Sequence, residues 1–128
     1  MTQLPAVTFA FAFALLFAGG PVPSADAAEA GKWEGKRIAA SATANRGVRC
    51  SPTGMSIDTK ASGDATGRLL YNRTRLRGKL DLNGAIELTG KQSRFTYSFS
   101  GRVNGSRIEG RWSEAFSGCN GTWYVNKR

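Results

Sequence analysis

The sequence contains no histidine, and it has only two cysteines among its 128 residues. The absence of histidine excludes Ser-His-Asp and Cys-His nucleophile arrangements, and with them most zinc and transition-metal sites. Acidic residues are also scarce, nine against 18 lysines and arginines, and none of them forms a spaced pair that would indicate general acid and base catalysis. We therefore expect a non-catalytic protein with no metal and no cofactor.

No apolar run reaches the ~20 residues that a membrane-spanning helix needs. The run from Ala6 to Ala18 has thirteen residues, is followed by helix-breaking glycines and prolines, and precedes Ala25-Asp26-Ala27. Small residues at the first and third of these positions are typical of a signal-peptidase site, although Met1 to Pro5 carries no positive charge. We predict an export signal at 1–27 and a single mature domain at 28–128 in the periplasm or outside the cell. An uncleaved membrane anchor is the alternative.

The two cysteines, Cys50 and Cys119, lie 69 positions apart. In an oxidising compartment two cysteines in a small exported domain are expected to form a disulfide. A bridge over this separation would remove about 4 kcal/mol of unfolded-chain entropy. Two separate buried thiols are the alternative.

Alternation of apolar and polar residues dominates the predicted mature domain, and helical periodicity is nearly absent. In 75–82 the three leucines and Gly78 fall on one face, and Arg75, Arg77, Lys79 and Asp81 fall on the other. Asn83-Gly84 then predicts a tight turn into a returning strand at 85–89. The same pattern surrounds Asn104-Gly105 and recurs more weakly elsewhere, giving seven or eight strands: 32–39, 53–59, 66–72, 75–82, 85–89, 95–103, 107–112 and 122–126.

A meander of short antiparallel strands removes its exposed edges by closing into a barrel or by folding into a sandwich. Gly67, Gly78, Gly101 and Gly110 lie inside predicted strands, where glycines mark bends or a close approach of two backbones. Such bends suit a small, strongly curved barrel. We predict an all-β antiparallel up-and-down meander closed as a barrel, with a β-sandwich as the alternative.

Three Gly-x-Trp units are present, and they end at Trp33, Trp112 and Trp123. The first, on the opening strand of a meander, resembles the calycin group of lipocalins, avidins and small periplasmic protease inhibitors. More broadly, the chain is similar to small exported β-meander domains of Gram-negative bacteria. The resemblance implies that Trp33 plugs one barrel end under Lys127 or Arg128 of the last strand. The chain departs from the group in its short length, its single long-range cysteine pair and its lack of an avidin-like biotin site.

Positive charge is the strongest compositional signal. The whole chain carries +9, and 18 basic against eight acidic residues give the predicted mature domain +10. Such a surface attracts polyanions, and arginine suits phosphate and sulfate because its planar fork donates two hydrogen bonds at once. Interleaved Glu87 and Glu109 leave a mixed, solvated face as the alternative. The candidate binding residues of this basic face are the outward cations of the predicted strands: Arg75, Arg77, Lys79, Arg102, Arg107 and Arg111.

Aromatic residues supply a second set of candidates. Phe95, Tyr97 and Phe99 share one strand face and are expected in the core, because so small a domain needs their rings there. Another set is expected near the barrel ends, as plugs or as ligand contacts: Trp33, Trp112, Trp123 and Tyr124.

Two functions are compatible with these features. The first is an exported binding or envelope-associated module whose basic face binds an anionic cell-surface polymer or lipid. The second is a calycin-like inhibitor of a secreted enzyme, or a small-ligand carrier, whose contacts lie in predicted loops at 41–52 and 113–120. Nucleic acid is not expected to be the physiological partner.

Overall fold

The computed structural model describes residues 27–41 and 43–128. The predicted export signal lies outside the described residues, apart from Ala27. Within this part of the chain, no helix has the length and the apolar character needed to cross a membrane.

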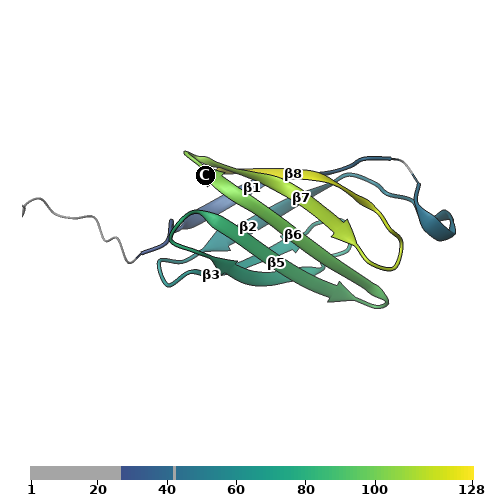
Figure 1. Cartoon of the computed structure of the whole chain (residues 1–128), viewed down its shortest axis with the longest axis horizontal. Helices are drawn as coiled ribbons and strands as arrows, with labels where there is room; N and C mark the ends of the chain where they lie inside the picture. Colours follow the sequence, from purple (N-terminus) through teal and green to yellow (C-terminus); the bar gives the residue numbers. More distant parts are fainter. Residues whose placement is uncertain (1–26, 42) are drawn as a thin grey trace, which may run out of the picture.

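In the described part of the chain, eight antiparallel strands follow one another in chain order, and each pairs with its neighbours in sequence. The last strand pairs with the first, from Trp33 opposite Lys127 to Ala39 opposite Gly121, so the sheet closes on itself (Figure 1). The predicted barrel is therefore confirmed and the sandwich is excluded. The strands are β1 (Gly31–Ala39), β2 (Thr53–Thr59), β3 (Asp64–Leu69), β4 (Arg75–Leu80), β5 (Ala85–Gln92), β6 (Phe95–Asn104), β7 (Arg107–Glu114) and β8 (Asn120–Lys127); one 3₁₀ turn, η3 (Asn45–Gly47), lies between β1 and β2.

The first predicted hairpin forms between β4 and β5, but its turn differs from the expected one. Asp81 Oδ1 accepts hydrogen bonds from the backbone N–H groups of Asn83 and Ala85, each at 2.9 Å. This side-chain contact ends β4 at Leu80 and leaves Leu82 59 % exposed. The prediction that Leu82 continues this strand on the same face as Leu76 and Leu80 was wrong, because aspartate favours a local turn over continued strand pairing.

The barrel interior is filled by side chains from alternate strand positions, as the alternation predicted. Trp123 needs space between β6 and β7, where Gly101 and Gly110 lie opposite each other. A Cβ on Gly101 would lie 2.7 Å from Trp123 Cζ2, and one on Gly110 would lie 1.8 Å from the carbonyl oxygen of Ser100. The two glycines therefore permit a close approach of backbone and indole that no larger residue allows.

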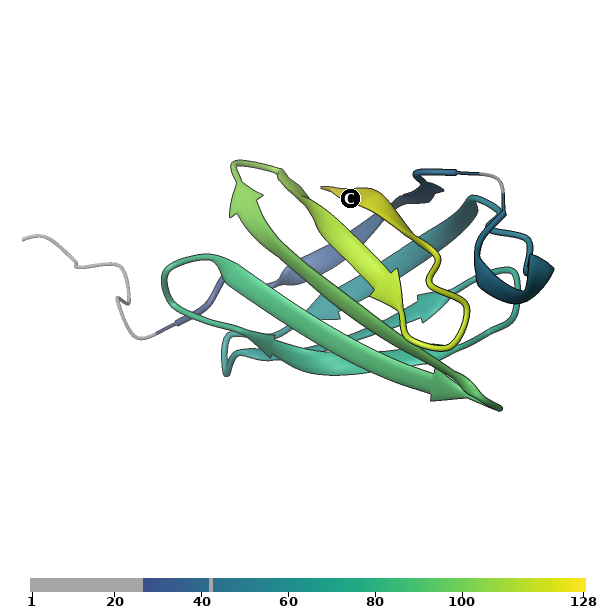
Figure 2. The same cartoon turned by 45° about the vertical axis from the view of Figure 1, so that its right-hand side comes forward.

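The two ends of the barrel differ in the connections that they carry (Figure 2). At the Trp33 end lie 27–30, the turns at 60–63, 81–84 and 105–106, and the C-terminal residue. Trp33 is fully buried there, its indole N–H donates to Thr59 Oγ1 at 3.0 Å, and Lys127 Nζ lies 5.5 Å from the ring centre. These contacts close this end.

The opposite end, called the Arg37 end, carries the connections 43–52, 70–74, 93–94 and 115–119. The predicted disulfide between Cys50 and Cys119 is confirmed, and it ties the first of these connections to the last. Both loops that the sequence proposed as ligand contacts therefore lie at this end.

Candidate functional site

The six cations of the predicted basic face do not lie on one continuous surface. Arg75, Arg77 and Lys79 project from β4, whereas the other three project from β6 and β7. Strand β5 lies between the two groups, because β4 pairs with β5 and β5 pairs with β6.

The second group lies among acceptors and acids. Arg107 pairs with Glu109 at 3.4 Å, and Glu109 also faces Arg102 across the β6–β7 ladder. Arg102 donates to the carbonyl oxygen of Asn83 at 3.1 Å, and Arg111 lies opposite Ser100. This region has the mixed charge that the alternative interpretation of the sequence described.

The first group extends into a cationic surface. Arg68 of β3 lies directly opposite Arg75, although like charges in that position repel each other. Arg75, Arg77 and Lys91 line one outer hollow of about 360 Å³ between β4 and β5. Lys79, further along β4, is paired with Asp64 at 2.7 Å and belongs to the Trp33 end.

The four candidate aromatic residues occupy different environments. Trp33 closes its own barrel end, and Trp123 lies in the interior, where its indole N–H donates to the carbonyl oxygens of Ser100 and Arg111. Tyr124 is only half-buried and lies under the guanidinium of Arg107, whose Cζ is 4.2 Å from the ring centre. Of the four, only Trp112 lines a cavity at the Arg37 end.

That cavity, called the Arg37 cavity, has a volume of about 350 Å³. Its wall comes from the connections between strands and from the last residues of β5 and β7, together with Arg37 of β1 and Phe95 and Tyr97 of β6. The disulfide contributes Cys119 to the wall and joins two of the connections that form it.

Arg37 is the most unusual residue in this wall, because its charged side chain is only 2 % exposed. Its Cζ lies 4.1 Å from the centre of the Trp112 ring, and at 5.2 and 5.7 Å from the rings of Tyr71 and Tyr97. Three aromatic faces therefore surround the cation and attract it through their ring quadrupoles. The indole N–H of Trp112 donates to the carbonyl oxygen of Ile38 at 3.0 Å, which fixes the orientation of the nearest ring.

Few of the N–H groups of the Arg37 guanidinium donate hydrogen bonds to the described residues. Within the described residues it donates one hydrogen bond, from Nη2 to the carbonyl oxygen of Ser51 at 2.6 Å. Its Nε is buried and has no hydrogen-bond partner among the residues that the structure describes. A guanidinium has five N–H groups, and the hydrogen bond to Ser51 uses one of them in a side chain that lines the cavity.

Glu114, also 2 % exposed, lines the same cavity but does not neutralise Arg37. Its carboxylate accepts hydrogen bonds from the backbone N–H groups of Thr96, Phe116 and Ser117 and from the Ser117 hydroxyl. Burial alone would raise the pKa of Glu114, but these hydrogen bonds outweigh burial, and the pKa is lowered. The charge of Glu114 is therefore held by its own turn and by the start of β6.

Tyrosine hydroxyls form a polar cluster on another side of the Arg37 cavity. The hydroxyls of Tyr71 and Tyr97 are 2.8 Å apart, and Asn72 Nδ2 donates to Tyr97 at 3.3 Å. Burial, together with the contact to Tyr71, raises the pKa of Tyr97 to about 12. Tyr97 therefore remains neutral at physiological pH and supplies no countercharge to Arg37.

Exposed cations lie on the connections and strand ends at the Arg37 end. We define the basic rim as Arg49, Arg73, Arg75, Lys91 and Arg94. None of the five forms an ion pair with a carboxylate of the described residues. Glu114 is the one acidic residue of the described chain at this end, and it is buried.

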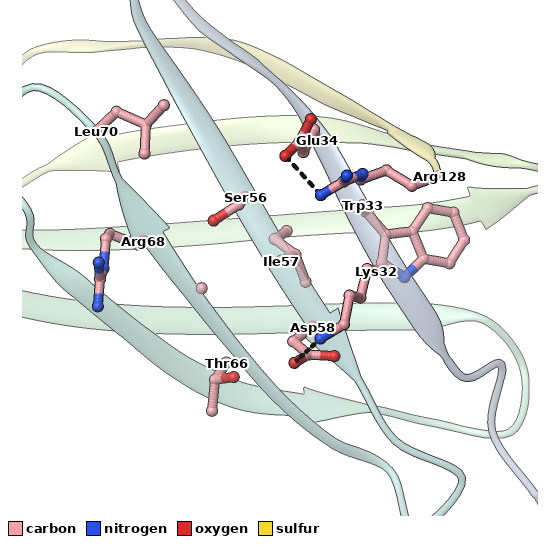
Figure 3. A pocket seen from close by; sticks show the side chains of 11 residues that line it. Lys32, Trp33, Glu34, Ser56, Ile57, Asp58, Thr66, Arg68, Leu70 and Arg128 are labelled. Carbon is pink, nitrogen blue, oxygen red and sulfur yellow. Dashed lines mark hydrogen bonds and ion pairs between the residues drawn. The ribbon is translucent and has the colours of Figure 1, made fainter.

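A second hollow, of about 360 Å³, lies on the outer surface of β1, β2 and β3 near the Trp33 end (Figure 3). Four of its charged side chains are already joined in ion pairs, Lys32 with Asp58 at 3.1 Å and Arg128 with Glu34 at 3.0 Å. Since opposite charges neutralise each other there, this hollow is a weaker candidate for an anion than the Arg37 cavity.

Sequence reasoning missed Arg37, although the signal was present. Trp33 was expected to face inward, and alternation along 32–39 places residue 37 on the same face. We found no match when the chain was compared with models of known protein families, with curated proteins and with solved structures. The resemblance to calycins stays a prediction.

Proposed function

We propose that this domain is a non-catalytic binding module that acts outside the cytoplasm and holds an anionic surface polymer at its Arg37 end. The observation that carries the proposal is the separation of charge along the barrel axis. The five ion pairs of the described residues all lie in the half of the barrel nearer the Trp33 end. The basic rim at the other end has no such partners.

The unpaired cations form a track that leads away from the rim. From Arg75 the track continues along the outer surface of β3 and β4 through Arg68 and Arg77. A linear polyanion can follow both the rim and this track, whereas a flat bilayer would meet only the end of the barrel. The arrangement therefore favours a polymer chain over a lipid surface.

The disulfide supports a location outside the cytoplasm. Bridges such as Cys50–Cys119 form and persist in oxidising compartments and are rare in the cytosol. The polymers that such a protein meets there include acidic polysaccharides and other anionic envelope components, and long-range attraction by an unneutralised basic surface accelerates their capture.

A charge-matched pair of variants tests the proposal on a heparin column developed with a salt gradient. The first variant replaces four rim residues, Arg73, Arg75, Lys91 and Arg94, with serine. The second removes the same charge from the Trp33 end by replacing four ion-paired cations, Lys32, Lys79, Arg107 and Arg128, with serine.

We expect the rim variant to elute at clearly lower salt than the wild-type protein, and the Trp33-end variant to elute close to it, because only unpaired cations engage the polymer. Equal shifts for the two variants would show that net charge alone governs retention and would overturn the proposal. Binding to anionic vesicles without retention on heparin would also overturn it and would identify a lipid surface as the partner.

A further inference from the structure

We infer that the Arg37 cavity is a discrete site for the oxyanion group of a small, ring-bearing organic molecule, such as a sugar acid or an aromatic acid. The inference rests on the proposed function in one respect, because the site lies beneath the basic rim that would attract its ligand. The inference adds a second level of recognition. The rim attracts any anionic molecule, whereas the cavity binds one oxyanion group.

The first argument is the unsatisfied state of Arg37. A buried cation ordinarily has a carboxylate partner, and a buried polar atom ordinarily has a hydrogen-bond partner. Within the described residues Arg37 has no carboxylate partner, and its Nε has no hydrogen-bond partner. The fixed planar donors of a guanidinium match the two oxygens of a carboxylate, sulfate or phosphate.

The second argument is that the site is preorganised, because its side chains are already fixed in the absence of a ligand. Trp112 is fixed by its hydrogen bond to Ile38, and Tyr97 is fixed by its contacts to Tyr71 and Asn72. The guanidinium is therefore held between aromatic faces before any ligand arrives. An anion that binds there would not need to order the arginine side chain, which removes one entropic cost of binding.

The third argument concerns the rest of the ligand. Val48 and Phe95 supply apolar wall, whereas Asn72, Gln92 and Ser93 supply polar groups. A volume of about 350 Å³ lies near the lower end of the ~300–1,000 Å³ usual for ligand pockets. An oxyanion attached to a single ring satisfies both the size and the mixed character of the wall.

Such a unit has two possible sources, a free small molecule or the terminal unit of an anionic polymer. The chemistry at Arg37 is the same for both. The two sources are distinguished by competition, because a free acid displaces a polymer from the protein only where the polymer end occupies the Arg37 cavity.

The experiment is a titration of the purified, disulfide-bonded protein with glucuronate and with benzoate, followed by nuclear magnetic resonance. The reporters are the Nε–H resonance of Arg37 and the indole N–H resonance of Trp112. Glucose and benzyl alcohol, which lack the anionic group, are the ligand controls. Inorganic phosphate shows whether an oxyanion without a ring is sufficient.

We expect at least one of the two acids to shift both resonances in a saturable manner, and the neutral analogues to leave them unchanged. Arg37→Gln should weaken binding at least tenfold. The matched control is Lys36→Gln, which removes the same charge from the adjacent, outward-facing position of β1 and should bind like the wild-type protein. Tyr71, one of the three rings around Arg37, is 55 % exposed, so Tyr71→Ala should weaken binding with little effect on folding.

Unchanged Arg37 and Trp112 resonances in the wild-type protein would overturn the inference, whether or not Arg37→Gln folds. Equal affinities of Arg37→Gln and Lys36→Gln for the acids would also overturn it. The proposed function fails separately, because retention on heparin is measured on rim variants that retain Arg37. Displacement of heparin fragments by glucuronate would identify the polymer terminus as the source, and binding of glucuronate without displacement would identify a free acid.

Discussion

Arg37 and Glu114 carry opposite charges, are both 2 % exposed and line the same cavity, yet they do not form an ion pair. Desolvation of an ion costs several kcal/mol, so each of the two needs compensation from its surroundings. Glu114 receives it from four hydrogen bonds, whereas Arg37 receives it from aromatic rings and one carbonyl oxygen. Glu114 therefore holds its turn together, whereas Arg37 has no carboxylate partner among the described residues.

We predict that Glu114→Gln destabilises the domain by about 3 kcal/mol at neutral pH, because a side-chain amide cannot accept all the buried hydrogen bonds that the carboxylate accepts. Since the pKa of Glu114 is lowered in the folded state, its contribution is present above the ordinary value of 4.5 and is lost as pH falls through the folded pKa. Urea unfolding at successively lower pH measures both effects.

The control for this prediction is Glu109→Gln, an exposed carboxylate on the same strand. We expect Glu109→Gln to leave stability nearly unchanged and to retain the acid-dependent loss, whereas Glu114→Gln should flatten that loss. Parallel acid profiles for the wild-type protein and Glu114→Gln would show that another group accounts for the acid sensitivity.

At the scale of whole elements, β6 and β7 approach each other more closely at Gly101 and Gly110 than side chains allow. The approach also makes room for Trp123, whose ring lies 5.7 Å from that of Phe99 in an edge-to-face arrangement. Phe99 in turn stacks on Trp112 at 6.2 Å. A chain of aromatic contacts therefore connects the Gly101–Gly110 pair to the wall of the Arg37 cavity.

We predict that Gly110→Ala lowers the free energy of unfolding by about 3 kcal/mol or more, because its Cβ would meet a backbone oxygen rather than a flexible side chain. The matched control is Ser98→Ala at an exposed position of β6, and its stability should stay within about 0.5 kcal/mol of the wild type. Thermal unfolding measures both. Equal melting temperatures would show that the strands separate easily at this point.

The strands could be predicted because alternation and turn residues are local signals. Trp33 and Arg37 are four positions apart on one strand, so alternation places both side chains inside the barrel. The usual exposure of arginine argues for the opposite face. The role of Glu114 could not be predicted, because its donors are presented by the conformation of the β7–β8 turn. The loops near 41–52 and 113–120 were predicted from the sequence, whereas the cavity between them depends on how the barrel closes.

At the scale of the molecule, the two barrel ends differ in construction. The Trp33 end is closed by an indole and held by ion pairs, and the Arg37 end combines a cavity, a disulfide and unpaired charge. The disulfide constrains the chain and also borders the proposed site, because Cys119 and the neighbouring Val48 and Arg49 line the cavity. A change in this bridge should therefore affect stability and binding together.

We predict that replacing Cys50 and Cys119 with serine lowers the free energy of unfolding by about 4 kcal/mol, because the bridge spans 69 positions of the unfolded chain. At temperatures where this variant remains folded, we expect weaker binding of glucuronate, since the two connections that form the wall of the cavity are no longer joined. Retention on heparin should change little, because four of the five rim cations lie outside the connection 43–52. Denaturant unfolding and the same titration test the prediction, and a variant with lowered stability but undiminished affinity would show that the barrel strands alone shape the cavity.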